Sequence, residues 1–357
     1  MMRSGLRNAD PRTMMLSVRG WLYGAAVGGA LGSGVRFDSG PAIAHKYGPL
    51  GPSELADVFG RPGAITSDMQ LTLLGVDAMI RSHIRSSWHE TDRLEEIRRS
   101  LRRWLLAEQD GWFPSNSALF QRRWADRTTV EAIRTYAEGG ELGTVEQPIN
   151  DSQGNSALLR SGVAALWSDD SSVVFEIGAR IGAMTHGHPN AYLSAGAYAV
   201  MLQHAFDSGD LQRAIVAALD ALQSWERHEP VSAALTAVHK AIFEPPRLDP
   251  ATMEGFGDST TALGALAIGA RAANASLRFP NALGPALIIS GDTATTGAIA
   301  GSLAGASCGS QQIPEHQVEG IELAEPIQQL ADLACLEFGN SPPQEAGFYE
   351  GFPFAPT

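Results

Sequence analysis

Apolar residues recur along most of this chain at the three- and four-residue spacing of amphipathic helices, whereas strand-like alternation is almost absent. The stretches 33–64 and 139–154 are rich in turn-forming residues and are expected to be surface excursions. The pattern therefore predicts an all-α fold, a single compact domain of many helices. Helices are expected over 18–31, 69–80, 93–108, 175–184, 192–206, 211–227, 231–243, 260–274, 281–289, 297–309 and 320–337.

Two of these helices carry glycine at every fourth position. The first has Gly24, Gly28 and Gly32, and no Lys-Ser/Thr follows as a phosphate loop requires. The second has its glycines at 297, 301, 305 and 309. Each glycine inside a helix costs about 1 kcal/mol relative to alanine. We therefore expect another backbone to pack against the second stripe, and we assign the first stripe to packing as well.

The chain has no internal repeat and no hydrophilic linker long enough to divide it. Residues 1–15 are expected to form a loose leader and residues 16–338 the domain. Residues 339–357, rich in proline and aromatic residues, are expected to form a loose tail.

Composition and charge limit the kinds of partner and the cellular compartment to be expected. The formal net charge of −13 over 357 residues argues against nucleic acid and anionic membranes as partners. No 18-residue apolar run lacks polar breaks, and no basic-then-apolar signal segment opens the chain. Cys308 and Cys335 lie in alanine-rich surroundings and are expected to be buried thiols in a reducing compartment. A soluble, cytoplasmic protein is predicted.

Asp and Thr side chains gather at two helix starts, Thr66-Ser67-Asp68 and Asp292-Thr293-Ala294-Thr295. Such residues are ordinary helix caps, because their oxygens accept from unpaired backbone N–H groups. The same oxygens are also the ligands that hard cations prefer. From the residues alone, both interpretations remain open.

Two further motifs carry polar groups between helices. Gly154-Asn155-Ser156 launches a helix with Arg160 one turn in, and could present N–H donors and a cation to an anion, although a plain turn is the simpler interpretation. The pair His186 and His188 could suggest zinc, but barrel metallohydrolases need strands that this chain lacks.

Taken in order, these motifs resemble those of the ADP-ribosylglycohydrolase family, which includes dinitrogen-reductase-activating glycohydrolase and the ADP-ribosylarginine hydrolases. The resemblance covers roughly 18–337. Its landmarks are Gly-Ala-Ala-Val-Gly-Gly-Ala-Leu-Gly from Gly24, Thr66-Ser67-Asp68, Gly154-Asn155-Ser156-Ala157-Leu158-Leu159-Arg160, Thr185-His186-Gly187-His188-Pro189 and Gly291-Asp292-Thr293-Ala294-Thr295.

The resemblance implies a pocket at the helix starts that holds two magnesium or manganese ions. Its metal ligands would be Thr66, Asp68, Asp292 and Thr295, of which Asp68 and Asp292 are also the candidate catalytic residues. ADP-ribose would be bound by Gly154, Asn155, Ser156, Arg160 and His186. The implied partner is ADP-ribose or an ADP-ribosylated protein or small molecule.

Four positions depart from the family pattern. Ser67 and Ala294 stand where two acidic ligands are expected, and Gly29 replaces the Asp of the opening helix. Arg36 falls near the place of an acidic residue in some members. Two dications facing only two carboxylates would leave a net charge of +2 in the pocket, so a weak or single ion, or none, is expected.

Two functions follow from these departures. The favoured one is a non-catalytic or strongly impaired member that keeps a cleft shaped for ADP-ribose and acts in binding, regulation or immunity. The alternative is an active ADP-ribosylhydrolase that cleaves ADP-ribose from a protein side chain or small molecule at a rebuilt metal site, which can be mononuclear.

Overall fold

The computed structural model describes residues 10–86, 94–107, 117–245 and 247–343. Its elements confirm the all-α prediction, and the only sheet among these residues is a two-stranded hairpin. The helices are α1 (Pro11–Ser33), α2 (Gly40–Tyr47), α3 (Ser67–Ser86), α4 (Glu95–Leu106), α5 (Arg127–Ala137), α6 (Leu158–Ser161), α7 (Ser171–Ala183), α8 (Pro189–Ser208), α9 (Leu211–Leu222), α10 (Glu229–Ile242), α11 (Pro250–Glu254), α12 (Ala262–Ala273), α13 (Phe279–Leu283), α14 (Thr293–Cys308), α15 (Glu315–Gly320) and α16 (Ala324–Phe338); the hairpin is β1 (Asp57–Val58) with β2 (Arg61–Pro62).

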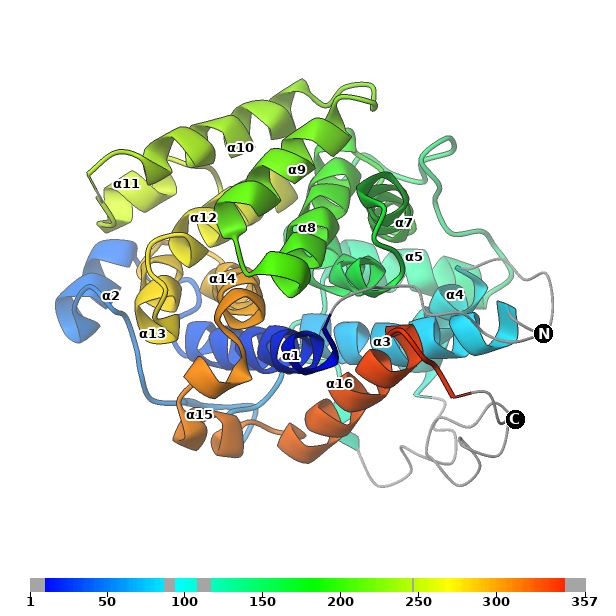
Figure 1. Cartoon of the computed structure of the whole chain (residues 1–357), viewed down its shortest axis with the longest axis horizontal. Coiled ribbons are helices and arrows are strands. Elements are labelled where there is room, and N and C mark those ends of the chain that lie inside the picture. The colour runs from blue at the N-terminus through cyan, green and yellow to red at the C-terminus, as the bar shows by residue number, and fades with distance from the viewer. Residues whose placement is uncertain (1–9, 87–93, 108–116, 246, 344–357) are drawn as a thin grey trace.

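Helices α1 and α14 form the centre of the molecule, and the two glycine stripes pack against each other (Figure 1). A Cβ atom added to Gly24 would lie 2.0 Å from the carbonyl oxygen of Gly301, and one added to Gly28 would lie 2.0 Å from that of Gly297. The backbones therefore approach too closely for any side chain. The prediction that another backbone packs on the second stripe is confirmed, except at Gly309, which ends α14 at φ 83°.

The other helices surround this pair. Helix α8 contacts α7, α9, α12 and α14 on one side, while α16 lies between α1 and α3 on the other. In Figure 1 the row formed by α8, α9 and α10 lies above the central pair, and α15 and α16 lie below it. No helix in the described part of the chain combines the length and hydropathy needed to cross a membrane.

Several expected boundaries differ from the structure. Residues 11–15, expected in the leader, form the first turn of α1, where Asp10 caps the helix and Met14 is buried. Residues 33–64 are not all loop, because Ser39 caps α2. The helix expected over 281–289 breaks at Gly284-Pro285. The helix expected over 320–337 breaks at Leu323, which has φ 64°.

Helix α5 was not predicted from the sequence. Cys308 and Cys335 are partly exposed rather than fully buried. Residues 1–9 and 344–357, at the ends of the predicted leader and tail, lie outside the described residues.

Candidate functional site

The two helix starts singled out in the sequence lie close together and both are capped as expected. Thr66 Oγ1 accepts from the Met69 N–H at 3.4 Å, and Asp292 Oδ1 accepts from the Thr295 N–H at 3.2 Å. Helix α1 reaches the same corner, since Thr293 Oγ1 donates to the carbonyl of Gly32 at 2.7 Å. The starts of α3 and α14 and the end of α1 thus define the site.

Asp68 stands in the first turn of α3 with a perturbed carboxyl group. Burial and the nearby charge of Asp292 raise its pKa to about 7, although Arg160 and Arg36 oppose the shift. The residue is partly exposed at the surface of the site. Near neutral pH its carboxyl group is therefore divided between the neutral and the ionised form.

The carboxylate of Asp292 accepts four hydrogen bonds from groups of this chain. Besides the Thr295 N–H, it accepts from Thr295 Oγ1 at 3.2 Å, from Asn155 Nδ2 at 3.1 Å and from Arg36 Nη2 at 3.0 Å. An ionised carboxylate has about four lone-pair positions. Three of these donors share Oδ2 and one binds Oδ1, so Oδ2 is fully occupied while Oδ1 keeps one acceptor position.

Arg36 is held in this position by aromatic rings. Its guanidinium carbon lies 4.8 Å from the ring centroid of Phe37 and 4.9 Å from that of Trp124, distances at which a cation is attracted to a ring face. Both aromatic residues have positive φ, at 66° and 52°, a conformation that costs on the order of 1–3 kcal/mol for such residues. The local backbone is therefore strained where the two rings enclose the cation.

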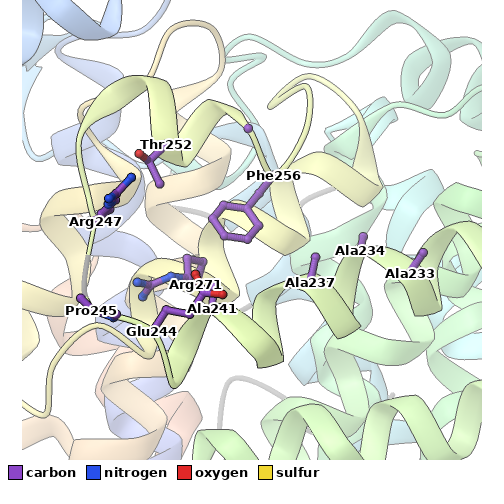
Figure 2. A pocket seen from close by; sticks show the side chains of 11 residues that line it. Ala233, Ala234, Ala237, Ala241, Glu244, Pro245, Arg247, Thr252, Phe256 and Arg271 are labelled. Carbon is purple, nitrogen blue, oxygen red and sulfur yellow. The ribbon is translucent and has the colours of Figure 1, made fainter.

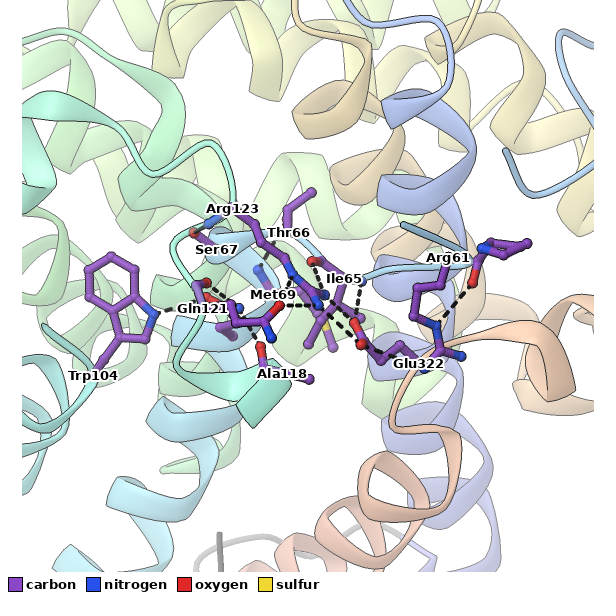
Figure 3. A network of polar contacts seen from close by, with 12 residues as sticks. Arg61, Ile65, Thr66, Ser67, Met69, Trp104, Ala118, Gln121, Arg123 and Glu322 are labelled. Atoms are coloured by element: carbon purple, nitrogen blue, oxygen red, sulfur yellow. Dashed lines mark hydrogen bonds and ion pairs between the residues drawn. The ribbon is translucent and has the colours of Figure 1, made fainter. Parts of the chain in front are cut away.

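Ser67, which replaces an expected acidic ligand, is used by the fold. Its Oγ accepts from the Arg123 N–H at 2.9 Å, and its own N–H donates to the Arg123 carbonyl at 3.1 Å. The Arg123 guanidinium bonds in turn to Glu322 and to the carbonyl of Ile65 (Figure 3). This network fixes the start of α3 and the chain that leads into Trp124.

Ala294 and Gly29, two further departures from the family pattern, bring no charged group to the site. Ala294 is 5% exposed in the first turn of α14. A Cβ atom added to Gly29 would meet Ala298 Cβ at 3.6 Å and the Ala294 carbonyl at 3.8 Å, ordinary contacts that need no shift. Within the described residues, no group of three or more His, Cys, Asp or Glu side chains is arranged to hold a metal ion.

The turn at Gly154 joins the site from the side of α12. Asn155 donates from its backbone to the Thr260 carbonyl at 3.2 Å and from Nδ2 to the Ser259 carbonyl at 2.8 Å. Gly154 pairs with Thr261, and a Cβ atom at Gly154 would lie 3.1 Å from Nε2 of His186. The expected N–H donors of Gly154 and Asn155 thus bond within the protein, and the turn positions Asn155 against Asp292.

Arg160 and His186 form a second, buried part of the site. Arg160 donates to the Ser156 carbonyl at 2.8 Å and to Thr185 Oγ1, which also lies 2.8 Å from Nδ1 of His186. Burial lowers the pKa of Arg160 to about 10 and lowers that of His186. His188, the other half of the His pair, instead caps α8 by accepting from the Asn190 N–H.

Asp126 belongs to this part of the site and was not found from the sequence. Burial alone would raise its pKa, but interactions with His186 and Thr129 outweigh that effect and hold the pKa at about 2. Its Oδ2 lies 3.4 Å from His186 Nε2. The only sequence signal was Asp126-Arg-Thr-Thr, an N-cap pattern for the unpredicted helix α5.

Hydrogen bonds join most of the residues expected at the site, while Thr66 caps α3 and Asp68 is influenced by the charges of Asp292, Arg160 and Arg36. Asn155 and Arg36 both donate hydrogen bonds to Asp292. The charge of Arg160 lowers the pKa of Asp68. Thr185 hydrogen-bonds to both Arg160 and His186. A cavity of about 300 Å³ is lined by Thr128, Asn150 and Ser152 together with the acidic Glu131 and Glu141. Asn150 connects its wall to the cluster by donating to the Thr185 carbonyl at 2.8 Å.

Comparisons with known proteins identify the family and agree with the fold. The model of the ADP-ribosylglycohydrolase family matches residues 11–343. Among solved structures 47 chains match, and one described as an ADP-ribosylglycohydrolase-related protein complex superposes with a TM-score of 0.66 at 19% identity, covering 92% of this chain and 99% of that one. A search of curated proteins gives no match. The family match spans nearly the whole chain and the fold agrees with it, so this protein belongs to the ADP-ribosylglycohydrolase family.

Proposed function

We propose that this protein binds ADP-ribose, or an ADP-ribosylated protein or small molecule, and lacks efficient metal-dependent hydrolysis. The observation that carries the proposal is the contact between Arg36 Nη2 and Asp292 Oδ2 at 3.0 Å. An arginine of this chain thereby neutralises the carboxylate that a catalytic cation would use. A regulatory or immunity role, in the cytoplasm, is consistent with such a site.

The charges argue against a two-ion centre. A dication about 4 Å from the Arg36 guanidinium would be repelled by roughly 8 kcal/mol at an effective dielectric constant of about 20. Only Asp68 and Asp292 supply negative charge at the two helix starts, and the Asp292 oxygens already accept four donors. The residues present therefore do not fit a dinuclear magnesium or manganese centre, and we propose a weak single ion or none.

Recognition of ADP-ribose is supported by the other half of the cluster. Arg160 supplies a buried positive charge beside His186, partly balanced by Asp68 and Asp126, that would attract a diphosphate. The nearby cavity is lined by Thr128, Asn150 and Ser152 but also by Glu131 and Glu141, so it provides room for a part of the ligand that carries no phosphate. Neither feature depends on the missing carboxylates.

One observation favours the alternative of an active hydrolase. Asp68 has a pKa of about 7 and is partly exposed, the properties of a group that can give and take a proton near neutral pH. With Asp68 as the acid or base, hydrolysis would need at most one weakly held ion. If Asp68 works without an ion, this candidate function predicts turnover that survives EDTA; if one weakly held ion takes part, EDTA removes the turnover.

Calorimetry with ADP-ribose, paired with release of ADP-ribose from an arginine-linked peptide, tests both functions. We expect saturable binding in EDTA and no release with or without Mg²⁺. Magnesium-dependent release would overturn the proposal. Release in EDTA that follows a pKa near 7 and is lost in Asp68→Asn would establish the alternative.

A further inference from the structure

A cavity of about 700 Å³ lies between α10, α11 and α12, away from the candidate site (Figure 2). None of its lining residues is among those assigned to the ADP-ribose site. Along α10 the wall is formed by small side chains at every fourth position, Ala233, Ala237 and Ala241. The volume lies within the range of small-molecule pockets, about 300–1,000 Å³.

Arg271, in the last turn of α12, reaches into this cavity. Only 4% of the residue is exposed, yet its Nε is buried without a hydrogen-bond partner and its guanidinium forms no ion pair in the part of the chain that the structure describes. The other deeply buried arginines behave differently: Arg123 bonds to Glu322, and Arg160 bonds to Ser156 and Thr185. Removing a charge from water without a partner costs several kcal/mol, so a buried guanidinium left with open donors is unusual.

The remaining walls indicate what could satisfy Arg271. Phe256 contributes an aromatic ring, and the alanines of α10 leave an apolar surface across from it (Figure 2). Arg247 adds a second positive charge at the exposed edge, against the single acidic group of Glu244. Burial lowers the pKa of Arg271 while Glu244 opposes that shift, although no ion pair forms between them. The pocket thus carries net positive charge in a chain whose formal net charge is −13.

We propose that this pocket binds a small planar compound that carries an anionic group, a carboxylate or a phosphate. The anion accepts from the guanidinium of Arg271, which can donate two parallel bonds to either group. The planar body lies between the ring of Phe256 and the alanine surface of α10. The proposal does not depend on the function of the Asp292 site.

Isothermal titration with benzoate, phenyl phosphate, acetate and inorganic phosphate tests the proposal on the full chain. We expect at least one of the two aromatic anions to bind at least tenfold more tightly than the anion without a ring. Arg271→Met should weaken that binding at least tenfold, and Arg213→Met, at an arginine whose side chain is 81% exposed, should leave it unchanged. The stronger of benzoate and phenyl phosphate identifies the anionic group.

Because Arg271→Met could impair folding, a second variant tests the same pocket at an exposed position. Ala237 is exposed on α10, so Ala237→Phe can fill the cavity from its edge without disturbing the core. It should abolish binding of the aromatic anion while binding of ADP-ribose stays as in the unmodified protein. Absence of saturable binding by both aromatic anions would overturn the proposal, as would binding that survives in Ala237→Phe or in folded Arg271→Met.

Discussion

Arg36 and Asp292, 256 positions apart in the sequence, are joined by an ion pair of 3.0 Å at the start of α14. The family resemblance marks Asp292 as an expected metal ligand, and the Arg36 guanidinium that pairs with it also lies against the rings of Phe37 and Trp124. We propose that this internal cation replaces part of the charge that a bound ion would bring. The consequences for pH dependence, metal affinity and ligand binding can each be measured.

The raised pKa of Asp68 predicts a specific dependence of stability on pH. Its folded value of about 7 lies above the ordinary value of 3.8, so the folded state holds the proton more tightly and stability falls as pH rises from about 4 to 7. Asp68→Asn cannot ionise and escapes that loss. Chemical denaturation should show the variant more stable than the unmodified protein at pH 8 by roughly 2–4 kcal/mol, with no difference at pH 4.

The matched control for this prediction is Asp57→Asn, at an exposed position on β1. It should shift stability by less than about 0.5 kcal/mol at either pH. An Asp68→Asn variant whose stability difference is the same at pH 4 and pH 8 would show that the Asp68 carboxyl is ordinary.

The helix pair α1 and α14 predicts opposite effects at two adjacent glycines. Gly28→Ala would place its Cβ 2.0 Å from the Gly297 carbonyl oxygen and force the helices apart, a loss of roughly 2–3 kcal/mol or more. Gly29→Ala meets only ordinary contacts, so it should be neutral or gain up to about 1 kcal/mol from helix propensity. Thermal unfolding of the two variants side by side measures this, and equal effects would contradict the close backbone packing.

Arg160 should contribute strongly to the binding of ADP-ribose. Arg160→Met removes a buried positive charge beside His186, and we expect calorimetry in EDTA to show affinity weaker by roughly 1.5–3 kcal/mol. Arg180→Met, at a side chain 39% exposed, serves as the control and should leave the affinity unchanged. Circular dichroism confirms that each variant is folded at the titration temperature. Unchanged affinity in folded Arg160→Met would place the ligand elsewhere.

Restoring the missing charges should restore metal binding. The combination Ser67→Asp, Ala294→Asp and Arg36→Glu supplies three carboxylates and removes the cation at Asp292. An Asp at position 67 can still accept from the Arg123 N–H, so the start of α3 is expected to survive the change. Calorimetry should then show magnesium binding with a dissociation constant of about 1 mM or tighter. Ser67→Asp alone or Ala294→Asp alone should gain little, because Arg36 still pairs with Asp292 in both. A triple variant that folds but gains no affinity would refute this explanation.

Much of the fold follows from the sequence because its signals are local. The helix after Asp292, the caps and the glycine stripes are all visible as short patterns. Helix α2 was missed because its Gly40-Pro41 start resembles a loop, although proline suits the first turn of a helix. Helix α5 was missed because only a few apolar side chains, such as Ile133, mark its buried face.

The site was only partly predictable because its decisive contacts are tertiary. Sequence motifs identified Asp68, Asp292 and Arg160, and the resemblance marked Arg36 as a departure. Arg36 also lies against Trp124, and the chain at Trp124 is held by the bond between Arg123 and Glu322, which are 199 positions apart in the sequence. Likewise, no local pattern connects Asp126 with His186, sixty positions later.

The most direct test of the central claim is a titration of the unmodified protein with Mn²⁺, followed by calorimetry and by electron paramagnetic resonance of the free ion. If Arg36 replaces the cation at Asp292, the titration will show no tight two-site binding, and Arg36→Ala will bind Mn²⁺ more tightly than the unmodified protein. Two tightly bound Mn²⁺ ions per chain in the unmodified protein would contradict the account.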